Sequence, residues 1–300
     1  MEVGVDFTVL RYFVAAADGG SVTAGAQAVH VSQPSVSRQI QALERELRLT
    51  LFSRQGGRLQ LTAAGRAFLP MARDLLAREE KARRAAGYLA SGAMQDIAIT
   101  TLGTTLTDVI APFLVTFTPE DPMPSVRTVG LDRLFDAPSS TDLYIAAAAP
   151  PPWLESRPIA ELPVFACVRA DHPLSGRGAV ELADLLDHEL LVLDKDFPAR
   201  RALDSAAELI RSAPRRTHRF FSPEVAMAVA AAGRGIAVVT DDPRFGLEAL
   251  RILTPEGPLR IHLCGAWDPH HHARGQLESL CRRLETFCID RYGEDVSPRH

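Results

Sequence analysis

The stretch that most constrains the fold lies near the start of the chain, at residues 21–46. Its sequence, SVTAGAQAVHVSQPSVSRQIQALERE, predicts two helices joined by a tight turn. Ser21 and Ser32 can cap them, because a serine oxygen accepts one of the backbone N–H groups that a first helical turn leaves unpaired. Pro34 then falls in the first turn of the second helix, where its missing N–H costs little.

The second of these helices has one apolar and one polar face. Apolar residues recur at steps of four, three and four, the spacing of a stripe that faces a core: Val36, Ile40, Leu43 and Leu47. The opposite face carries Pro34, Arg38, Gln41 and Arg45, flanked by Ser35 and Ser37. Arginine can pair with guanine, glutamine with adenine, and serine with a base edge or a phosphate, so this face suits a DNA major groove. A solvated amphipathic helix without a partner is the alternative.

A short hairpin is expected directly after these helices. Residues 51–52 and 59–61 have the composition of strands, and residues 56–57 are two glycines that supply the tight turn. Arg54 and Arg58 lie near the tip, where they can reach phosphates or a minor groove. The hairpin is then the wing of a winged helix-turn-helix, and an ordinary surface hairpin is the alternative.

One long helix is predicted from residue 63 to about residue 90, with Thr62 as its cap. It would span roughly 42 Å. Its apolar positions are Phe68, Met71, Leu75, Leu76 and Leu89, and much of the remainder is basic. A helix of this length with one apolar stripe usually packs on a partner helix, so we interpret it as a dimer-forming linker. A helix that lies on its own domain is the alternative.

Charge is divided unevenly along the chain. Residues 1–84 hold 12 Lys and Arg against 8 Asp and Glu, a net +4, whereas residues 85–300 hold 21 against 29, a net −8. This division suits an anionic partner at the N-terminal end only. The apolar runs are far shorter than the ~20 residues that span a bilayer, and no secretory signal is recognisable. We therefore expect a cytoplasmic protein without a membrane partner, and four cysteines without a CxxC pair agree with a reducing compartment.

From Asp96 onward strands and helices alternate, which predicts parallel sheets with covered faces. The expected strands are 96–100, 125–129, 142–147, 163–169, 190–193, 219–221, 235–240 and 259–266. The expected helices are 106–117, 200–211, 223–232 and 275–292. The turn after Ala149 and the stretch from Trp267 are candidate crossings of a hinge between two lobes.

The motifs resemble a known family. SQPSVSRQI, followed by LE, LF and LTAAG, is similar to the winged helix-turn-helix of the LysR-type transcriptional regulators, and the resemblance covers about residues 6–91. Further along, ACVRADHPL, LADLLDHELLVL and AVAAAGRGIAVV are similar to the effector domain of that family. The family fold implies an N-terminal all-α winged helix-turn-helix followed by an α/β effector domain of two lobes, similar to a type II periplasmic binding protein.

The pattern of elements and the resemblance together give the expected domain bounds. These are a DNA-binding domain at 1–62, a dimerisation helix at 63–92, lobe I at 93–162 with 268–292 returning to it, lobe II at 163–267, and a disordered tail at 293–300. LDRLFDAPSSTDLYIAA departs from the family pattern, because it is shorter and richer in Pro and Ser than the helix usual at that place.

The implied function is sequence-specific transcriptional regulation under the control of a small-molecule effector, not catalysis. The implied partners are double-stranded promoter DNA, the effector, and further copies of the chain in a homodimer through residues 63–90 and a homotetramer. RNA polymerase is compatible as a further partner, and no cofactor is expected.

Carried over by position, the resemblance implies two sets of site residues. The DNA-binding set is Ser32, Gln33, Pro34, Ser35, Ser37 and Arg38, with Arg54 and Arg58 on the wing. The effector-binding set is Thr100, Thr101, Gly103, Thr104, Asp194, Lys195, Phe197 and Thr240.

The effector is expected to be a small organic anion, with a carboxylate as the first choice. The loop TTLGTT follows a strand and opens a helix, so its N–H groups would direct positive charge into the cleft. Lys195, one of two lysines in the chain, follows the apolar strand LLVL at the matching edge of the second lobe. A structural cap at Thr104 and a solvated Lys195 are the alternative.

Other site chemistries receive less support. No P-loop, GxGxxG, GxSxG or HExxH motif occurs, and the lone Gly233-Arg234-Gly235 is interpreted as a helix-to-strand turn. Residues 270–272 are three histidines that could bind a metal with Asp268 or His262, but adjacent loop histidines rarely all face one ion. Cys281 and Cys288 are interpreted as buried structural thiols, with a redox pair as the alternative.

Overall fold

The computed structural model describes residues 6–55, 58–135 and 140–298, which fall into two compact units. Unit 1 ends at Ala90 and also includes Ser140, and unit 2 comprises the other described residues from Ser91 onward. Across these ranges, no helix has the length and apolar character that a membrane span requires.

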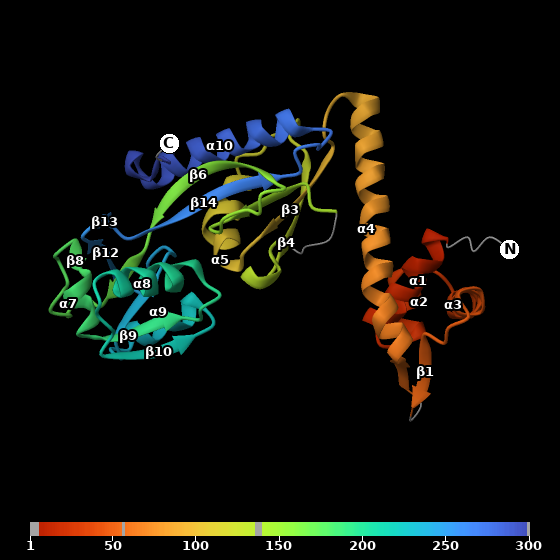
Figure 1. Ribbon diagram of the computed structural model, residues 1–300, viewed down its shortest axis with the longest axis horizontal. Coiled ribbons are helices and arrows are strands. Elements are labelled where there is room, and N and C mark those ends of the chain that lie inside the picture. Colours follow the sequence, from red (N-terminus) through yellow and green to blue (C-terminus); the bar gives the residue numbers. More distant parts are fainter. Residues whose placement is uncertain (1–5, 56–57, 136–139, 299–300) are drawn as a thin grey trace. The chain divides into compact units, whose positions relative to one another are not determined.

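Unit 1 consists of helices and one hairpin (Figure 1). Its elements are α1 Phe7–Asp18, α2 Val22–Ala28, α3 Gln33–Leu47, β1 Phe52–Gln55, β2 Arg58–Leu61 and α4 Ala63–Ser91. The side chains of Asp6, Ser21 and Thr62 accept backbone N–H groups at 2.7, 3.0 and 2.9 Å, so the predicted caps at Ser21 and Thr62 are confirmed. The helix-turn-helix, the hairpin and the long helix thus follow one another as predicted.

The apolar stripe of α3 is buried, as its spacing predicted. Leu43 packs with Leu10 and Phe13 of α1, and Val36 and Ile40 pack with Ala16 of the same helix, while Leu47 is half-buried. The start of α4 packs tightly on the hairpin, because a Cβ on Gly65 would lie 2.1 Å from the carbonyl oxygen of Leu51. Backbone contact of this closeness requires glycine and fixes where the long helix leaves the hairpin.

Unit 2 contains two sheets, and we call the parts built on them lobe I and lobe II. The strands of lobe I are β3 Asp96–Thr101, β4 Met123–Thr128, β5 Leu143–Ala146, β6 Glu155–Pro163 and β14 Arg260–Trp267. Its helical elements are α5 Gly103–Thr105, the π-helix η1 Leu106–Ile110, α6 Ala111–Leu114, the 3-10 turn η2 Leu131–Arg133 and α10 Arg274–Tyr292. The sheet order is β4-β3-β5-β14-β6, and α10 runs along β6 and β14 (Figure 1).

Lobe II is built on a seven-stranded sheet. Its strands are β7 Phe165–Val168, β8 Ala179–Glu181, β9 Glu189–Leu193, β10 Arg216–Phe220, β11 Ile236–Val239, β12 Glu248–Thr254 and β13 Gly257–Pro258. Its helices are α7 Leu182–Leu186, α8 Pro198–Leu209 and α9 Pro223–Ala231. The order is β10-β9-β11-β7-β12-β13, with β8 paired to β12.

The prediction of parallel sheets is correct for only part of each lobe. β3 runs parallel to β4 and β5, and β9 runs parallel to β10 and β11. However, β14 is antiparallel to β5 and β6, and β7 is antiparallel to β11 and β12. The antiparallel strands are those that carry the chain from one lobe to the other and back.

The predicted hinge crossings at Ala149 and Trp267 are wrong. The chain crosses to lobe II between β6 and β7 and returns between β13 and β14, where the Val164 N–H donates to the Leu259 carbonyl at 2.9 Å. β14 belongs to the sheet of lobe I, so lobe II ends near Leu259 and not at residue 267. Trp267 instead ends β14 as a buried residue, and its Nε1 donates to Glu155 at 3.1 Å.

The chain end up to residue 298 is also ordered, which corrects the expectation of a disordered tail. It forms the 3-10 turn η3 Glu294–Val296 with Val296 buried. Arg260 donates to the Asp295 carbonyl at 2.6 Å, and Arg251 pairs with the Asp295 carboxylate at 2.8 Å. Residues 299 and 300 lie outside the described part of the chain.

Candidate functional site

The polar face of α3 is accessible opposite its buried stripe. Ser32, Pro34 and Arg38 are exposed, whereas Gln33, Ser35 and Ser37 are half-buried. Gln39 and Gln41 are exposed on the same helix, and Gln39 was not among the predicted residues. The surface therefore offers the guanidinium, amide and hydroxyl groups that read base edges and phosphates.

Ser32 occupies the N-cap position of α3, but its hydroxyl makes no capping hydrogen bond. The predicted cap is therefore wrong in its bond although right in its position. Because α3 has 15 residues, its first-turn N–H groups form the positive end of a full-length helix dipole. The Ser32 hydroxyl and these N–H groups can together bind a phosphate.

The wing arginines lie on the two paired strands of the hairpin. Arg54 is in β1 and Arg58 in β2, and Gln55 pairs with Arg58 at the last register position. The side chains of both arginines, and the predicted turn at Gly56 and Gly57, lie outside the described residues.

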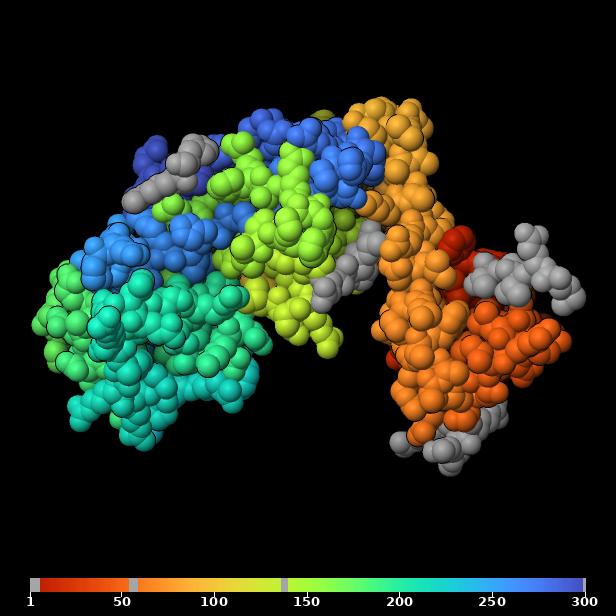
Figure 2. All heavy atoms as spheres, viewed as in Figure 1, coloured from red at the N-terminus to blue at the C-terminus, as the bar shows by residue number. Residues whose placement is uncertain are grey.

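A pocket of about 360 Å³ lies between the two lobes of unit 2. Lobe I contributes Leu102, Gly103, Thr104, Thr107, Val129, Gly130 and Leu131, and lobe II contributes Asp196, Phe197, Pro198, Phe221, Ser222, Pro223, Glu224 and Asp241. These residues follow β3, β4, β9, β10 and β11 at their carboxyl ends, where open α/β sheets bind ligands. Figure 2 shows lobe II, in green to cyan, adjoining yellow-green atoms of lobe I on this face of unit 2.

Only three of the predicted effector residues line this pocket, namely Gly103, Thr104 and Phe197. Thr100 and Thr101 are buried inside lobe I, where Thr100 Oγ1 lies 2.9 Å from Thr141 Oγ1 and Thr101 Oγ1 donates to the Ile145 carbonyl at 2.6 Å. Their hydroxyls hold the sheet together and do not face the lining.

The other predicted effector residues also lie off the lining. Asp194 pairs with Arg219 at 3.2 Å, Lys195 is exposed to solvent, and Thr240 precedes the lining residue Asp241. In each loop a neighbour of the predicted residue lines the pocket instead, Asp196 in the first and Asp241 in the second. The sequence indicated the correct strand ends but not which loop residue turns inward.

The charges of the lining are acidic. Of the described lining residues, none is Lys, Arg or His, and the charged ones are Asp196, Glu224 and Asp241. Ser222 caps α9 and its Oγ lies 2.8 Å from Glu224 Oε2. That bond lowers the pKa of Glu224, so this carboxylate is negatively charged at neutral pH.

Asp241 of lobe II faces Asp108 of lobe I. Asp241 is 1% exposed, and the Oδ2 atom of each carboxyl group is buried without an N–H or O–H donor among the described residues. Burial, a hydrogen bond to Asp108 and the charge of Asp108 raise the pKa of Asp241 to about 8. Because two ionised carboxylates repel each other, the proton that Asp241 retains at its raised pKa allows it to lie beside Asp108.

Arg244 connects the two lobes beside this pair. Its Nη2 lies 3.4 Å from Asp108 Oδ1, and its Nη1 lies 3.4 Å from Glu224 Oε1. Asp108 lies in the π-helical turn η1, and π-helical turns occur frequently at functional sites. The guanidinium contacts Oδ1 of Asp108 and donates no hydrogen bond to the Oδ2 atom of either acid.

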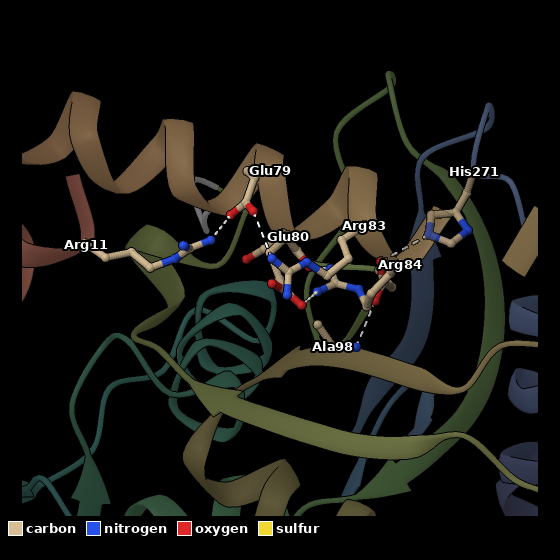
Figure 3. Close-up of polar contacts among 9 residues, drawn as sticks. Arg11, Glu79, Glu80, Arg83, Arg84, Ala98 and His271 are labelled. Atoms are coloured by element: carbon tan, nitrogen blue, oxygen red, sulfur yellow. Dashed lines mark hydrogen bonds and ion pairs between the residues drawn. The ribbon is translucent and has the colours of Figure 1, made fainter. Parts of the chain in front are cut away.

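The long helix α4 is fixed to unit 1 on one side and exposes apolar residues on another. Arg11 of α1 pairs with Glu79 at 2.6 Å, and Arg83 pairs with the same carboxylate at 3.1 Å (Figure 3). Phe68 and Leu76 pack on the core of unit 1. Met71, Leu75 and Leu89 are 63%, 40% and 78% exposed, so part of the predicted stripe is not buried by the described residues of unit 1.

The cysteines, glycines and histidines singled out from the sequence have structural roles in the fold. Cys281 and Cys288 are buried, as predicted, and burial raises the pKa of each thiol to about 12. Gly233 and Gly235 lie in the turn between α9 and β11, also as predicted. His271 is buried against Asp142, and no cluster of three or more His, Cys, Asp or Glu within the described ranges could hold a metal ion.

Two family models match most of the chain. The model described as bacterial regulatory helix-turn-helix protein, lysR family, matches residues 7–66. The model described as LysR substrate binding domain matches residues 91–288. Together they span the α3 surface and both lobes around the pocket.

Individual relatives are regulators. The HTH-type transcriptional regulator TfdT of Cupriavidus pinatubonensis is 41% identical over 108 residues, which cover 36% of this chain and 47% of TfdT. The match therefore spans about half the length of that relative. The DNA-binding transcriptional dual regulator OxyR of Escherichia coli (strain K12) is 29% identical over 288 residues, which cover 92% of this chain and 93% of OxyR.

Solved structures share the fold. Full-length CbnR, complexed with its target DNA, superposes with a TM-score of 0.71 at 24% identity, over 93% of this chain and 100% of that one. At this identity the likeness establishes the fold alone.

Proposed function

The chain belongs to the LysR family of DNA-binding transcriptional regulators, not enzymes, and from that premise we propose how its own residues bind DNA and respond to an effector. The proposed domains are a DNA-binding domain at 1–62, a linker helix at 63–92, and two effector lobes whose second boundary lies near Leu259. A cytoplasmic location is proposed because a protein that binds promoter DNA must share its compartment.

The exposed polar face of α3 is the proposed surface for base recognition. The exposure of this face opposite the buried stripe is the main support for the proposal. Ser32, Gln33, Pro34, Ser35, Ser37 and Arg38 would enter the major groove, with Ser32 and the first-turn N–H groups on a phosphate. Arg54 and Arg58 of the wing would contact the flanking backbone or minor groove.

The pocket between the lobes is the proposed effector site. It lies at the carboxyl ends of parallel strands from both lobes, so a bound molecule would contact both at once. Such a ligand can favour one lobe arrangement only by its differential affinity for the two arrangements. The sequence predicted an organic anion bound by Lys195. Lys195 does not line the pocket, and the charged lining residues are carboxylates, so the described residues of the lining offer no cation to bind such an anion. We therefore propose a small-molecule effector without assigning it a net negative charge.

A homodimer through α4, and a homotetramer of two such dimers, are the proposed assemblies. The exposed Met71, Leu75 and Leu89 support the dimer, since apolar side chains on a long helix are expected to pack on a partner helix. Two DNA-binding domains held together can bind two half-sites, which raises affinity through effective concentration.

The decisive experiment is nuclease footprinting of the full chain on the region upstream of its own gene. We expect protection of two half-sites about one or more helical turns apart. A thermal-shift screen with a metabolite panel then identifies ligands, which stabilise the protein by roughly 2.7 kcal/mol at one hundred times Kd. A footprint that no stabilising metabolite alters would contradict effector control while leaving DNA binding intact.

A further inference from the structure

The acidic lining of the interlobe pocket identifies the chemistry of its ligand, given the proposed function of that pocket. Asp241 is almost fully buried, lines the pocket and interacts with Asp108, and its Oδ2 atom has no hydrogen-bond donor among the described residues. A buried carboxyl pair of this kind lacks one positive charge or one proton.

Among the described residues, Arg244 is the cation that pairs with Asp108, and no cation forms an ion pair with Asp241. Arg244 contacts the other oxygen of Asp108 and also Glu224, each at 3.4 Å. Arg291 is engaged by Asp242 at 2.7 Å, and the Tyr292 hydroxyl donates to the backbone carbonyl of Asp108 at 2.8 Å. The charged and titratable groups around the pair are thus Glu224, Asp242, Arg244, Arg291 and Tyr292, and none of them donates to Asp241 Oδ2.

The remainder of the lining suits the apolar body of a small molecule. Phe197 and Phe221 contribute rings from lobe II, and Leu102, Val129 and Leu131 contribute aliphatic side chains from lobe I. The volume of about 360 Å³ is that of a site for a small metabolite. A site with apolar side chains next to carboxylates complements a ligand that carries a protonated amine on a hydrocarbon.

We propose that the effector carries a protonated amine on an apolar body, and that its ammonium group binds the buried carboxyl group of Asp241 beside Asp108. The ammonium N–H donates to Asp241 Oδ2, and the displaced proton leaves to solvent. The ammonium group then contacts lobe II through Asp241 and lobe I through Asp108, while the apolar body contacts the lining of both lobes. A free amine and an amino acid share this chemistry and differ only in the added carboxylate.

Three probes with one phenyl body separate the possibilities: phenethylamine, phenylalanine and hydrocinnamate. Titration calorimetry of the full chain should show binding of at least one amine-bearing probe about tenfold or more tighter than hydrocinnamate, which has only the carboxylate. Binding of phenethylamine alone would identify a simple amine, and preference for phenylalanine would identify an amino acid. Proton release, measured in buffers of different ionisation enthalpy, should accompany binding near neutral pH.

Asp241→Asn removes the charge and keeps the size of the side chain. It should lower the affinity for the amine-bearing probe about tenfold or more, whereas Asp187→Asn, on the exposed surface of lobe II and outside the lining, should leave that affinity within about twofold. Retained binding to promoter DNA shows that both variants are folded.

Some outcomes overturn the inference. Tighter binding of hydrocinnamate, or amine binding that Asp241→Asn leaves unchanged, would contradict it while an effector site in this pocket still stood. Failure of every amine-bearing probe at millimolar concentration, together with a stabilising metabolite that carries no amine, would also contradict it, and the proposed function would remain.

Discussion

His271 Nε2 lies 3.1 Å from Asp142 Oδ1, and both side chains are buried in lobe I (Figure 3). The Ala273 N–H donates to His271 Nδ1 at 3.1 Å, so the ring is neutral with its proton on Nε2, which donates to Asp142. The other oxygen of Asp142 accepts the Ala98 N–H at 2.8 Å. One carboxylate thus joins the chain before α10 to strand β3.

Asp142→Ala is therefore expected to destabilise lobe I. The substitution leaves the Ala98 N–H and the His271 Nε2–H buried without these acceptors, at a cost of about 1–3 kcal/mol for each group. Urea denaturation of the full chain, followed by tryptophan fluorescence, should show a lower midpoint. Asp132→Ala, on the exposed turn η2, is the matched control and should leave the midpoint unchanged.

The N-terminal part of the fold could be predicted from sequence because its signals are local. The apolar spacing of α3 and the helix caps depend on residues three or four apart, as at Val36, Ile40 and Leu43 and at Ser21 and Thr62. The lobe boundary depends instead on strand pairing over about a hundred residues, and β14 has the same apolar pattern in either sheet. Nothing local to Trp267 shows that it pairs with Glu155 and ends a strand of lobe I.

The pocket could be predicted to the level of strand ends but not of side chains. Asp196 and Asp241 each lie one residue beyond a predicted site residue, in loops past the ends of β9 and β11, where no periodicity of the sequence indicates which side chain turns inward. Thr101 has the position of a ligand residue, but its hydroxyl satisfies the carbonyl of Ile145 across the sheet. The pairing of Asp108 with Asp241 joins separate lobes and has no sequence signal.

Two glycines of α4 should respond oppositely to alanine. Gly65→Ala places a Cβ 2.1 Å from the Leu51 carbonyl oxygen, so the helix start must move away from the hairpin. We expect a loss of about 1–3 kcal/mol of stability and weaker DNA binding. At Gly87 a Cβ meets no atom of the described residues within 4 Å, so Gly87→Ala should stabilise the helix by about 0.5–1 kcal/mol. Thermal unfolding followed by circular dichroism measures both, and equal shifts would contradict the packing argument.

The acid pair predicts that stability falls as pH rises. The pKa values of Asp108 and Asp241 are raised in the folded chain, mainly by burial, that of Asp241 to about 8. Above the unfolded-state pKa of about 3.9, the folded state binds more protons than the unfolded state. The contribution of the pair to the free energy of unfolding therefore declines from mildly acidic pH up to about pH 8. Asp241→Asn removes this proton, and its Tm should decline less than that of the wild type between pH 6 and pH 8.5. Parallel Tm profiles would show that the pair does not bind the proton.

Arg38→Ala tests the proposed reading surface. If Arg38 contacts a base, its loss should cost about 1–3 kcal/mol of DNA affinity and relax specificity at one position. If it contacts a phosphate, affinity should fall on all sequences and the salt slope should decrease by about one. Fluorescence anisotropy on the footprinted site distinguishes the two, with Arg177→Ala in lobe II as the control. Wild-type affinity at every salt concentration would exclude Arg38 from the interface.

Leu75→Asp tests the proposed dimer, because the effect of the charge depends on what Leu75 contacts. Leu75 is 40% exposed in the single chain, so an aspartate there remains hydrated and should leave unit 1 folded. In a helix-to-helix interface the same carboxylate would be buried without a partner, which costs several kcal/mol for each copy. Sedimentation velocity should therefore show the wild type as a dimer or larger and the variant as a smaller species. Leu75→Met keeps the apolar contact and should sediment as the wild type. If Leu75→Asp keeps the wild-type sedimentation coefficient, the dimer interface lies on another face of the chain.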